Sequence, residues 1–423
     1  MRLIAALSAF CLFATSVAAE PVYLTAASLA DPASGRIISN PVVVIDNGKV
    51  TSVGNAAAMT IPADAEKIDL GARTILPGLI DMHVHLTSSA TKGRGYDRLG
   101  YQKERRTIWG VMNAQKTLMA GFTTVRDVGS RDYATVALRE SINEGEIPGP
   151  RLFVSGPPVG IVGGHCSDVS LLPPEFNAKG LAVATGPWEM REQVRENIKY
   201  GVDLIKTCST GGVFSKGTTL GAAQGTVEEL TAIVEEAHAR GLKVASHAHG
   251  AVGIKNAITA GVDTIEHASF MDDEAIRMAK RAGTYLSMDI YNTEYTLAEG
   301  EKLGVREESL AKERQVGEIQ RNSFTKAVQA GVKVVFGSDA AIYPHGDNAN
   351  QLSRMVRFGM TPVQAVQAAT VVAAEALGQE DSVGSIKAGA SADIIAVDGN
   401  PFEDVSVLEN VSFVMKEGVI YKD

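Results

Sequence analysis

Two histidines stand one residue apart in the stretch DMHVHLTSS, residues 81–89, directly after the apolar run TILPGLI. If that run is a β-strand, His83 and His85 point to the same side, because side chains alternate across a strand. Two imidazoles directed at one point are typical of a metal site. A lone strand histidine, however, is more often an ordinary core residue. The pair by itself leaves both interpretations open.

Four more polar residues stand at the ends of later β-rich runs, namely Lys206, His247, His267 and Asp339. Neutral imidazoles and a carboxylate are ligands that suit Zn²⁺ or a similar divalent ion. Unpaired polar groups are rarely buried by chance, so their recurrence at equivalent positions predicts a metal centre. Lys206 would repel a cation as an ammonium. It fits the site if its amine has become a carbamate, an anion that can bridge two metals.

The elements that must position these residues follow a repeated phrase, in which a helix-like stretch ends in glycine and a β-rich run begins at once. Glycine just past a helix is the left-handed stop signal, and apolar, β-branched runs suit strands buried on both faces. Before Gly241, Thr226 and Glu229 have the spacing of a capping box, and an apolar stripe follows them. The predicted strands lie in 74–80, 122–129, 151–156, 202–212, 242–250, 262–270, 284–290 and 332–340.

Eight strands alternating with helices predict an α/β fold, a (β/α)₈ TIM barrel over residues 77–384, with a doubly wound open sheet as the alternative. In a barrel the polar residues at the strand ends would meet on one face. The flanks, residues 20–76 and 385–423, alternate short strands with turns. They predict one small β-sandwich domain built from both chain ends.

The first 19 residues join Arg2 to an apolar run that ends in small residues. This pattern predicts a signal peptide cut near Ala19 and a secreted or periplasmic protein. The remaining cysteines, Cys166 and Cys208, are too few for a disulfide framework, and Cys208 is interpreted as a buried, inert thiol. The formal net charge of −9 argues against nucleic acid or an anionic membrane as partner.

The motif set PGLIDMHVH, IKTCSTGG, SHAHG, IEHAS and GSDA resembles the metal-dependent amidohydrolase superfamily over nearly the whole chain. The resemblance implies two divalent ions, most simply Zn²⁺. His83, His85 and Asp339 would hold one ion, His247 and His267 the other, and N6-carboxylated Lys206 would bridge them. It also implies that a water activated by the metals attacks the substrate and that Asp339 moves its proton to the leaving amine.

Further segments, GGHCS, TGGVFS and PHGDN, look like the zinc-dependent prolidase-like branch, and in particular the bacterial ochratoxin-hydrolysing amidohydrolases. The implied reaction removes a C-terminal amino acid from a dipeptide or an N-acyl amino acid, with ochratoxin A as one substrate. The implied catalytic pair is Asp339 and His165, the latter donating to the developing oxyanion. The candidate substrate-binding residues are Ser88, His165, Val213, Phe214, Tyr291, Ile342 and His345.

Three interpretations compete with this one. A cyclic amidase or lactonase could use the same metals, and a binding protein could keep the fold without catalysis. A single-metal deaminase is disfavoured because such enzymes usually lack the strand-4 lysine. His249 shares the parity of His247 and could support the ligands, while Asp127 beside Arg126 suggests a structural ion pair. Prolidase-like relatives imply a homo-oligomer, with an octamer among the expected states.

Overall fold

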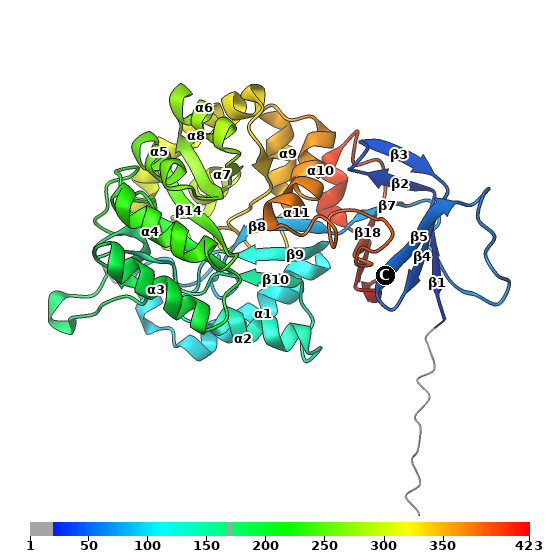
Figure 1. Cartoon of the computed structure of the whole chain (residues 1–423), viewed down its shortest axis with the longest axis horizontal. Helices are drawn as coiled ribbons and strands as arrows, with labels where there is room; N and C mark the ends of the chain where they lie inside the picture. The colour runs from blue at the N-terminus through cyan, green and yellow to red at the C-terminus, as the bar shows by residue number, and fades with distance from the viewer. Residues whose placement is uncertain (1–19, 168–170) are drawn as a thin grey trace, which may run out of the picture.

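The computed structural model describes residues 20–167 and 171–423, so the predicted signal peptide lies outside the described residues. Two parallel sheets form the centre of the larger body (Figure 1). One has the order β10-β9-β8 and the other β13-β14-β15-β16-β17. Seven of the eight predicted runs contain one of these strands, whereas the first run, 74–80, covers β7 (Thr74–Pro77) of a different sheet and only the first two residues of β8. The parallel strands are β8 (Leu79–Val84), β9 (Phe122–Asp127), β10 (Arg151–Val154), β13 (Leu204–Cys208), β14 (Lys243–Gly250), β15 (Thr264–Phe270), β16 (Tyr285–Ser287) and β17 (Val334–Val335).

Backbone hydrogen bonds connect the two sheets at both pairs of edges. On one side the amide of Asp203 donates to the carbonyl of Val154 at 2.8 Å, between β13 and β10. On the other, the amide of Met82 donates to the carbonyl of Phe336 at 2.9 Å, and Val84 forms a parallel bridge with Ala340. The carboxyl ends of the two sheets therefore lie on the same side of the molecule.

Helices cover the outside of these sheets (Figure 1). The six glycines of the repeated phrase all have positive φ, between 73° and 93°, as the predicted left-handed helix stops require. The capping box of Thr226 and Glu229 is present at α4. The helices are α1 (Lys103–Met119), α2 (Ala134–Asn143), α3 (Pro187–Lys199), α4 (Val227–His238), α5 (Ala251–Ala260), α6 (Asp273–Ala282), α7 (Asn292–Glu299), α8 (Glu307–Ala330), α9 (Asn350–Arg357), α10 (Pro362–Ala368) and α11 (Val371–Leu377).

Two further sheets lie beside this body, and one of them combines strands from both chain ends (Figure 1). Residues from both sheets, such as Leu24 and Ile45 on one and Ile75 and Phe413 on the other, share one apolar core. The sheet orders are β5-β4-β1-β6 and β20-β19-β18-β7-β2-β3. Their strands are β1 (Val22–Thr25), β2 (Ser28–Asp31), β3 (Arg36–Ser39), β4 (Pro41–Asp46), β5 (Lys49–Asn55), β6 (Glu66–Asp69), β7 (Thr74–Pro77), β18 (Ile394–Val397), β19 (Phe413–Lys416) and β20 (Val419–Lys422).

Gly78 is the single residue between β7, in the terminal sheet, and β8, which carries His83. A Cβ atom at this position would lie 2.0 Å from Oγ1 of Thr123 on β9. Only glycine fits this close approach, which explains the glycine in the stretch Pro77-Gly78-Leu79. The junction fixes where β8 begins, and therefore where His83 lies along the axis of that strand.

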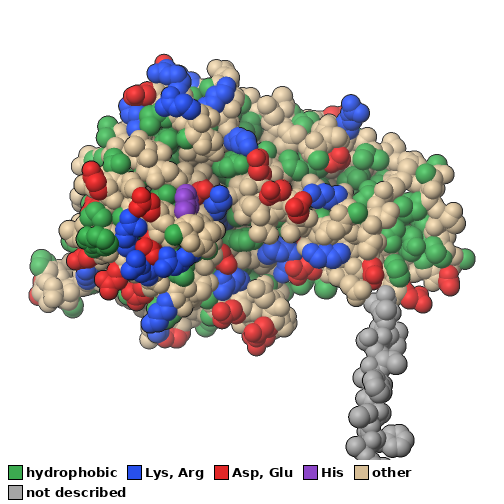
Figure 2. All heavy atoms as spheres, viewed as in Figure 1, with side chains coloured by type: hydrophobic (Ala, Val, Ile, Leu, Met, Phe, Trp, Pro, Cys, Tyr) green, Lys and Arg blue, Asp and Glu red, His purple; other side chains and the backbone are tan. Residues whose placement is uncertain are grey.

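Charged side chains of both signs are interspersed over the larger body on the face shown in Figure 2. Hydrophobic side chains gather on that face over the part formed by the terminal sheets. Among the described residues, none of the helices combines the length and the apolar composition that crossing a membrane would need.

Candidate metal centre

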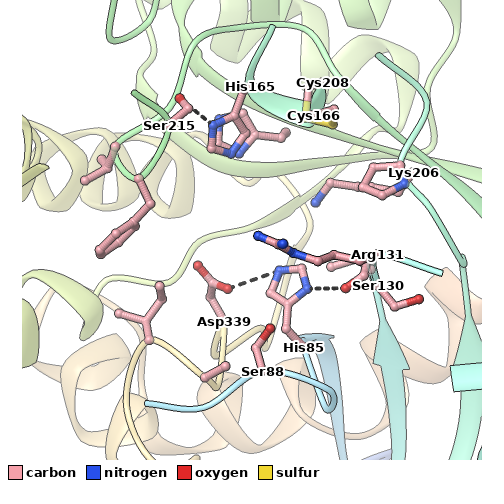
Figure 3. A pocket seen from close by; sticks show the side chains of 18 of the residues that line it. His85, Ser88, Ser130, Arg131, His165, Cys166, Lys206, Cys208, Ser215 and Asp339 are labelled. Carbon is pink, nitrogen blue, oxygen red and sulfur yellow. Dashed lines mark hydrogen bonds and ion pairs between the residues drawn. A yellow bond between two sulfur atoms is a disulfide. The ribbon is translucent and has the colours of Figure 1, made fainter. Parts of the chain in front are cut away.

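The predicted ligands meet at the carboxyl ends of the parallel strands. Three groups have ligand atoms within 4.8 Å of one another: His83, His85 and Asp339; His247, His249 and His267; and His267, Asp289 and Asp339. The Nε2 atoms of His83 and His85 lie 3.5 Å and 3.4 Å from Oδ1 of Asp339. Lys206 lines the same cavity (Figure 3). The structure thus brings all six predicted metal ligands together.

Each of three ligand imidazoles is oriented by a partner on its Nδ1 atom. Nδ1 of His83 lies 2.8 Å from Glu266, and Nδ1 of His267 lies 2.8 Å from Asp289. Nδ1 of His85 donates to the carbonyl of Gly129 at 2.8 Å. Such contacts fix the tautomer and the ring orientation of a metal-binding histidine. They leave the Nε2 atoms of these residues directed at the centre of the site.

The surroundings of His247 show that the site can accept a metal ion. Its Nε2 atom is buried and has no hydrogen-bond partner, which is costly for a polar atom unless a ligand satisfies it. The ring stacks on His165 with centroids 4.0 Å apart and lies 4.5 Å from the ring of His267. A Cβ atom on Gly212 would lie 2.8 Å from this Nε2 atom, so the glycine keeps the space around it open. The donor set and the orphaned nitrogen fit a divalent cation.

Burial sets the protonation of the site. It lowers the pKa of His85 to about 4, and the pKa values of His83 and His247 fall well below the ordinary value for the same first cause. These imidazoles are therefore neutral, the form that binds a metal. Burial also lowers the pKa of Lys206 to about 8, although carboxylates nearby oppose the shift. A neutral amine is the form that reacts with carbon dioxide to give a carbamate.

The acidic side of the site is crowded. Burial, followed by repulsion from Asp289, raises the pKa of Asp339 to about 7. A cation between these carboxylates would relieve that repulsion. The backbone is also unusual here, because His267 has φ 71° and Asp339 φ 53°. Left-handed conformations of residues other than glycine are strained and cluster at functional sites.

The cavity above the ligands has a volume of about 530 Å³. Five of the seven predicted substrate-binding residues line it: Ser88, His165, Val213, Phe214 and Ile342. Nδ1 of His165 shares a hydrogen bond with the hydroxyl of Ser215 at 2.9 Å, and the side chain faces His85 and Asp339 from across the cavity (Figure 3). Burial lowers the pKa of His165 to about 3, so this imidazole is neutral as well.

Two predicted pocket residues, Tyr291 and His345, do not line the cavity. Tyr291 precedes α7 and packs against Tyr343, with ring centroids 4.8 Å apart, under the guanidinium of Arg354. His345 is buried below the site, between the hydroxyl of Thr117 and the backbone carbonyl of His85. In this structure neither side chain lines the cavity, so a substrate-binding role for Tyr291 and His345 stays a prediction.

Two further interpretations from the sequence need correction. Cys208 is no free thiol, because it forms a disulfide with Cys166 (Figure 3). Arg126 pairs with Glu266 at 2.7 Å and not with Asp127. The carboxylate of Asp127 accepts the backbone amides of Leu86 and Gly129 instead.

Asp289 and Glu266 were not predicted as site residues, although the sequence position of each pointed to the site. Asp289 stands near the end of the run TYLSMDI, the position that supplied candidates on five other strands. It holds His267 and accepts from the side chains of Gln320 and Asn292. Glu266 immediately precedes His267, and its buried carboxylate has no solvent to stabilise it without a partner such as His83. His249, proposed to support the ligands, is buried and donates or accepts at Nδ1 with Ser269 at 2.7 Å.

Known proteins share both the sequence and the fold. Residues 74–422 match the model of the amidohydrolase family. Ochratoxinase from Aspergillus niger is 31% identical over 94% of this chain and 86% of its own length. This relative is fungal, whereas the sequence resemblance pointed to a bacterial group. A Xaa-Pro dipeptidase crystallised with methionine in its active site is 37% identical, with a TM-score of 0.90 over 95% of this chain and 100% of that one. A prolidase in complex with N-methylphosphonate-L-proline is 31% identical, with a TM-score of 0.87 over 95% and 99%.

The family match covers most of the chain, and the clustered histidine and aspartate side chains supply the metal ligands that the chemistry of the family needs. The chain belongs to the amidohydrolase family and is a metal-dependent amidohydrolase that acts on carbon–nitrogen bonds.

Proposed function

We propose that the protein hydrolyses the amide bond between an acyl group and a C-terminal amino acid, as in an N-acyl amino acid, a dipeptide or ochratoxin A. The observation that carries this proposal is the placement of His165, which stacks on His247 and faces His85 and Asp339 across a cavity of about 530 Å³ (Figure 3). That volume suits a small ligand such as an acylated amino acid. The similarity to a Xaa-Pro dipeptidase and to an ochratoxinase supports the same bond type.

In this proposal His83, His85 and Asp339 would hold one divalent ion, and His247 and His267 would hold the second. Lys206 would be the shared ligand, as its carbamate. When bound, two such ions, most simply Zn²⁺, would lower the pKa of a water molecule and polarise the scissile carbonyl. The lowered pKa of Lys206 and the orphaned Nε2 atom of His247 support these assignments.

Two side chains move or hold protons in the proposed reaction. Asp339, with a pKa raised to about 7 by burial, accepts the proton of the attacking water and delivers it to the departing amine. His165 donates from Nε2 to the carbonyl oxygen while Ser215 holds Nδ1, so the donor is in place before negative charge develops.

We also propose that the two parallel sheets form one closed (β/α)₈ barrel, with the terminal sheets as a separate β-sandwich. The hydrogen bonds from Asp203 to Val154 and from Met82 to Phe336 support closure at both pairs of edges. A barrel would explain why ligands from five different strands reach one point. Export through the first 19 residues is supported by the Cys166–Cys208 disulfide, because such bonds persist in oxidising compartments. Light scattering would test the expected homo-oligomer.

A metal count together with a substrate panel tests the function. We expect close to two ions per chain, and turnover of N-acyl amino acids, Xaa-Pro dipeptides or ochratoxin A in preference to hydantoins and lactones. Asp339→Asn should lower kcat by about 1,000-fold or more, while Asp273→Asn, at an exposed site on α6, should not change it. One ion per chain would overturn the two-metal assignment. Preferred turnover of lactones or hydantoins would favour the competing hydrolase, and no turnover of any substrate would favour a binding protein.

A further inference from the structure

The imidazole of His165 is held firmly in place. The residue begins a short 3₁₀ helix, His165–Ser167, in the segment between β10 and α3. Its ring stacks on His247, and a Cβ atom on Gly212 would lie 2.5 Å from both Nδ1 and Cε1 of this ring. Its backbone amide donates to Oε1 of Gln224 at 2.8 Å. With the ring fixed in this way, the property still to be set is which of its two nitrogens carries the hydrogen.

The partner of Nδ1 determines that choice. In a neutral imidazole only one ring nitrogen carries a hydrogen, and the hydrogen bond made by the other nitrogen selects the tautomer. A donor role at the substrate oxygen needs the hydrogen on Nε2, so Nδ1 must accept. The partner of Nδ1 is the hydroxyl of Ser215 at 2.9 Å, across the cavity from His85 and Asp339 (Figure 3). Because a hydroxyl can donate or accept, Ser215 alone does not decide the tautomer.

The hydroxyl of Thr218 is the second partner of Ser215. Their two oxygens share a hydrogen bond, and Thr218 is buried without lining the cavity. Another acceptor within reach is the backbone carbonyl of Gly212, 3.3 Å from the oxygen of Ser215 and 3.5 Å from that of Thr218. Both distances exceed the usual range for a hydroxyl donor. The shorter contacts therefore favour a chain in which Thr218 donates to Ser215 and Ser215 donates to Nδ1 of His165.

Donation by Thr218 also makes Ser215 the better donor. A hydroxyl that accepts one hydrogen bond is polarised and donates the next one more strongly. The same contact occupies acceptor capacity of Ser215 that a hydrogen on Nδ1 of His165 would otherwise use. Removal of the Thr218 hydroxyl therefore favours the opposite tautomer, with the hydrogen on Nδ1.

The loop that carries both hydroxyls is held independently by the start of α8. Nζ of Lys312 donates to the carbonyl of Ser215 at 2.9 Å and pairs with Glu308 at 3.0 Å. Glu308 also accepts the backbone amide of Gly217 at 3.0 Å. These contacts involve only backbone atoms of the loop, so they remain when the side chain of Thr218 is replaced. The Thr218 hydroxyl can thus be removed without releasing Ser215.

We propose that Thr218 is a positioning residue that acts through Ser215 to hold His165 with its hydrogen on Nε2. The effect on turnover rests on the proposed function, in which this hydrogen is donated to the oxygen of the scissile carbonyl. Thr218 keeps the donor in one state before the substrate binds, and a donor prepared in this way stabilises mainly the transition state. Its loss should therefore lower kcat and leave KM nearly unchanged.

Kinetics of the Zn²⁺-loaded enzyme with N-benzoyl-L-phenylalanine test this effect. Thr218→Val removes the hydroxyl with little change of shape and should lower kcat by about 3- to 10-fold, as for the loss of one hydrogen bond. Thr218→Ser keeps a hydroxyl and should retain most of the wild-type kcat. Ser215→Ala tests the same chain from its other end and should lower kcat by about tenfold or more.

The matched control is Thr219→Val, because Thr219 is the neighbouring threonine, is exposed and does not line the cavity. It should keep the wild-type kcat and KM. Wild-type kcat in Thr218→Val, or an equal loss of kcat in Thr219→Val, would overturn the proposal. A loss in Thr218→Val that appears in KM alone would overturn it too, because it would show a contribution to substrate binding instead.

A measurement of the tautomer separates this proposal from the proposed function. In Zn²⁺-loaded protein with ¹⁵N-labelled histidine, NMR distinguishes the ring nitrogen that carries a hydrogen from the one that does not, and His165→Gln identifies the signals of this residue. We expect the hydrogen on Nε2 in the wild type, in Thr218→Ser and in Thr219→Val, and a shift toward Nδ1 in Thr218→Val. If no amide is hydrolysed but this pattern appears, the proposed reaction fails and the role of Thr218 stands. A hydrogen on Nδ1 in the wild type, or an unchanged tautomer in Thr218→Val, would contradict that role whatever the activity.

Discussion

Glu266 lies 2.8 Å from Nδ1 of His83 and 2.7 Å from the guanidinium of Arg126, and no part of its side chain reaches solvent. The carboxylate thus joins a buried cation from β9 to a metal-ligand histidine from β8. Burial alone would raise its pKa, but Arg126 and His83 outweigh burial and hold the pKa of Glu266 well below its usual value. Glu266 is therefore a fixed negative charge that sets the tautomer of His83.

Replacing this charge should weaken both metal binding and the fold. For Glu266→Gln we expect metal affinity to fall by about 10- to 100-fold, because the partner that orients His83 loses its charge. The free energy of unfolding should fall by about 3–5 kcal/mol, because Arg126 stays buried without an anion. Chelator competition and denaturant unfolding measure the two effects. Glu235→Gln, at a surface pair with Arg191, is the control and should change neither. Metal affinity equal to the wild type would contradict the role of Glu266.

The Cys166–Cys208 disulfide should couple stability to activity. It links residues 42 positions apart, for which loop-closure entropy gives a stabilisation of about 4 kcal/mol. Cys166 adjoins His165, so the variant Cys166→Ser/Cys208→Ser should also lose about tenfold or more in kcat as the imidazole becomes less well placed. Unfolding curves and steady-state kinetics measure these changes. A reductant should have the same effects on the wild type and none on the double variant. Full kcat in the reduced wild type would rule out the positioning role.

The capping box of α4 should affect stability alone. The hydroxyl of Thr226 accepts the amide of Glu229, while the Glu229 carboxylate accepts the amide of Thr226. We expect Thr226→Ala to lower the free energy of unfolding by about 1 kcal/mol, because an N-terminal amide loses its acceptor. Denaturant unfolding measures the change, and kcat should be unaltered. Thr60→Ala, at an exposed position outside the helices, should leave stability as it is. A loss of activity in Thr226→Ala would show that α4 communicates with the site.

Glu313 should give stability a pH dependence. Burial raises its pKa to about 7, although the hydroxyl of Thr293, which donates to it at 2.6 Å, opposes the shift. The native protein then holds this proton up to about pH 7, whereas the unfolded chain releases it near the ordinary pKa of 4.5. Because the native state binds more protons in that window, this group's stabilisation is complete below the lower value and is lost as pH rises to the upper one.

In Glu313→Gln this contribution should disappear, because the amide has no proton to release. Unfolding free energies measured from pH 4.5 to 8 with saturating Zn²⁺ should therefore fall less steeply with pH for the variant than for the wild type. Glu318→Gln, at an exposed position of the same helix, should follow the wild-type profile. Parallel profiles for Glu313→Gln and the wild type would contradict the raised pKa.

The elements and the ligand cluster could be predicted because they depend on local rules. Glycine stops, β-branched runs and the capping box act within a few residues, so seven of the eight parallel strands and the start of α4 followed from the sequence, while the first run was divided by Gly78 between two sheets. His83, His85, His247 and His267 lie in or next to strands whose carboxyl ends meet on one side. For them, strand position alone determined proximity.

Residues carried by loops, or paired across the fold, could not be placed in this way. Tyr291 and Tyr343 meet through the paths of two separate loops, and Cys166 reaches Cys208 only because an irregular segment returns over β13. The pairing of Arg126 with Glu266 spans 140 residues. The carboxylate of the neighbouring Asp127 accepts hydrogen bonds from backbone amides instead. Adjacency in sequence was misleading there, because successive strand residues face opposite sides.

The Cys166–Cys208 bond also bears on which metals the site accepts. Both cysteines line the cavity with Lys206 and His247. As thiolates they would offer two soft donors, which select for metals different from those that imidazole and carboxylate prefer. Joined as a disulfide, neither sulfur can ionise, and the described residues that line the cavity present only nitrogen and oxygen donors to an incoming ion. The crosslink therefore keeps thiolate donors out of the cavity, and we expect the reduced chain to prefer different metals from the oxidised one.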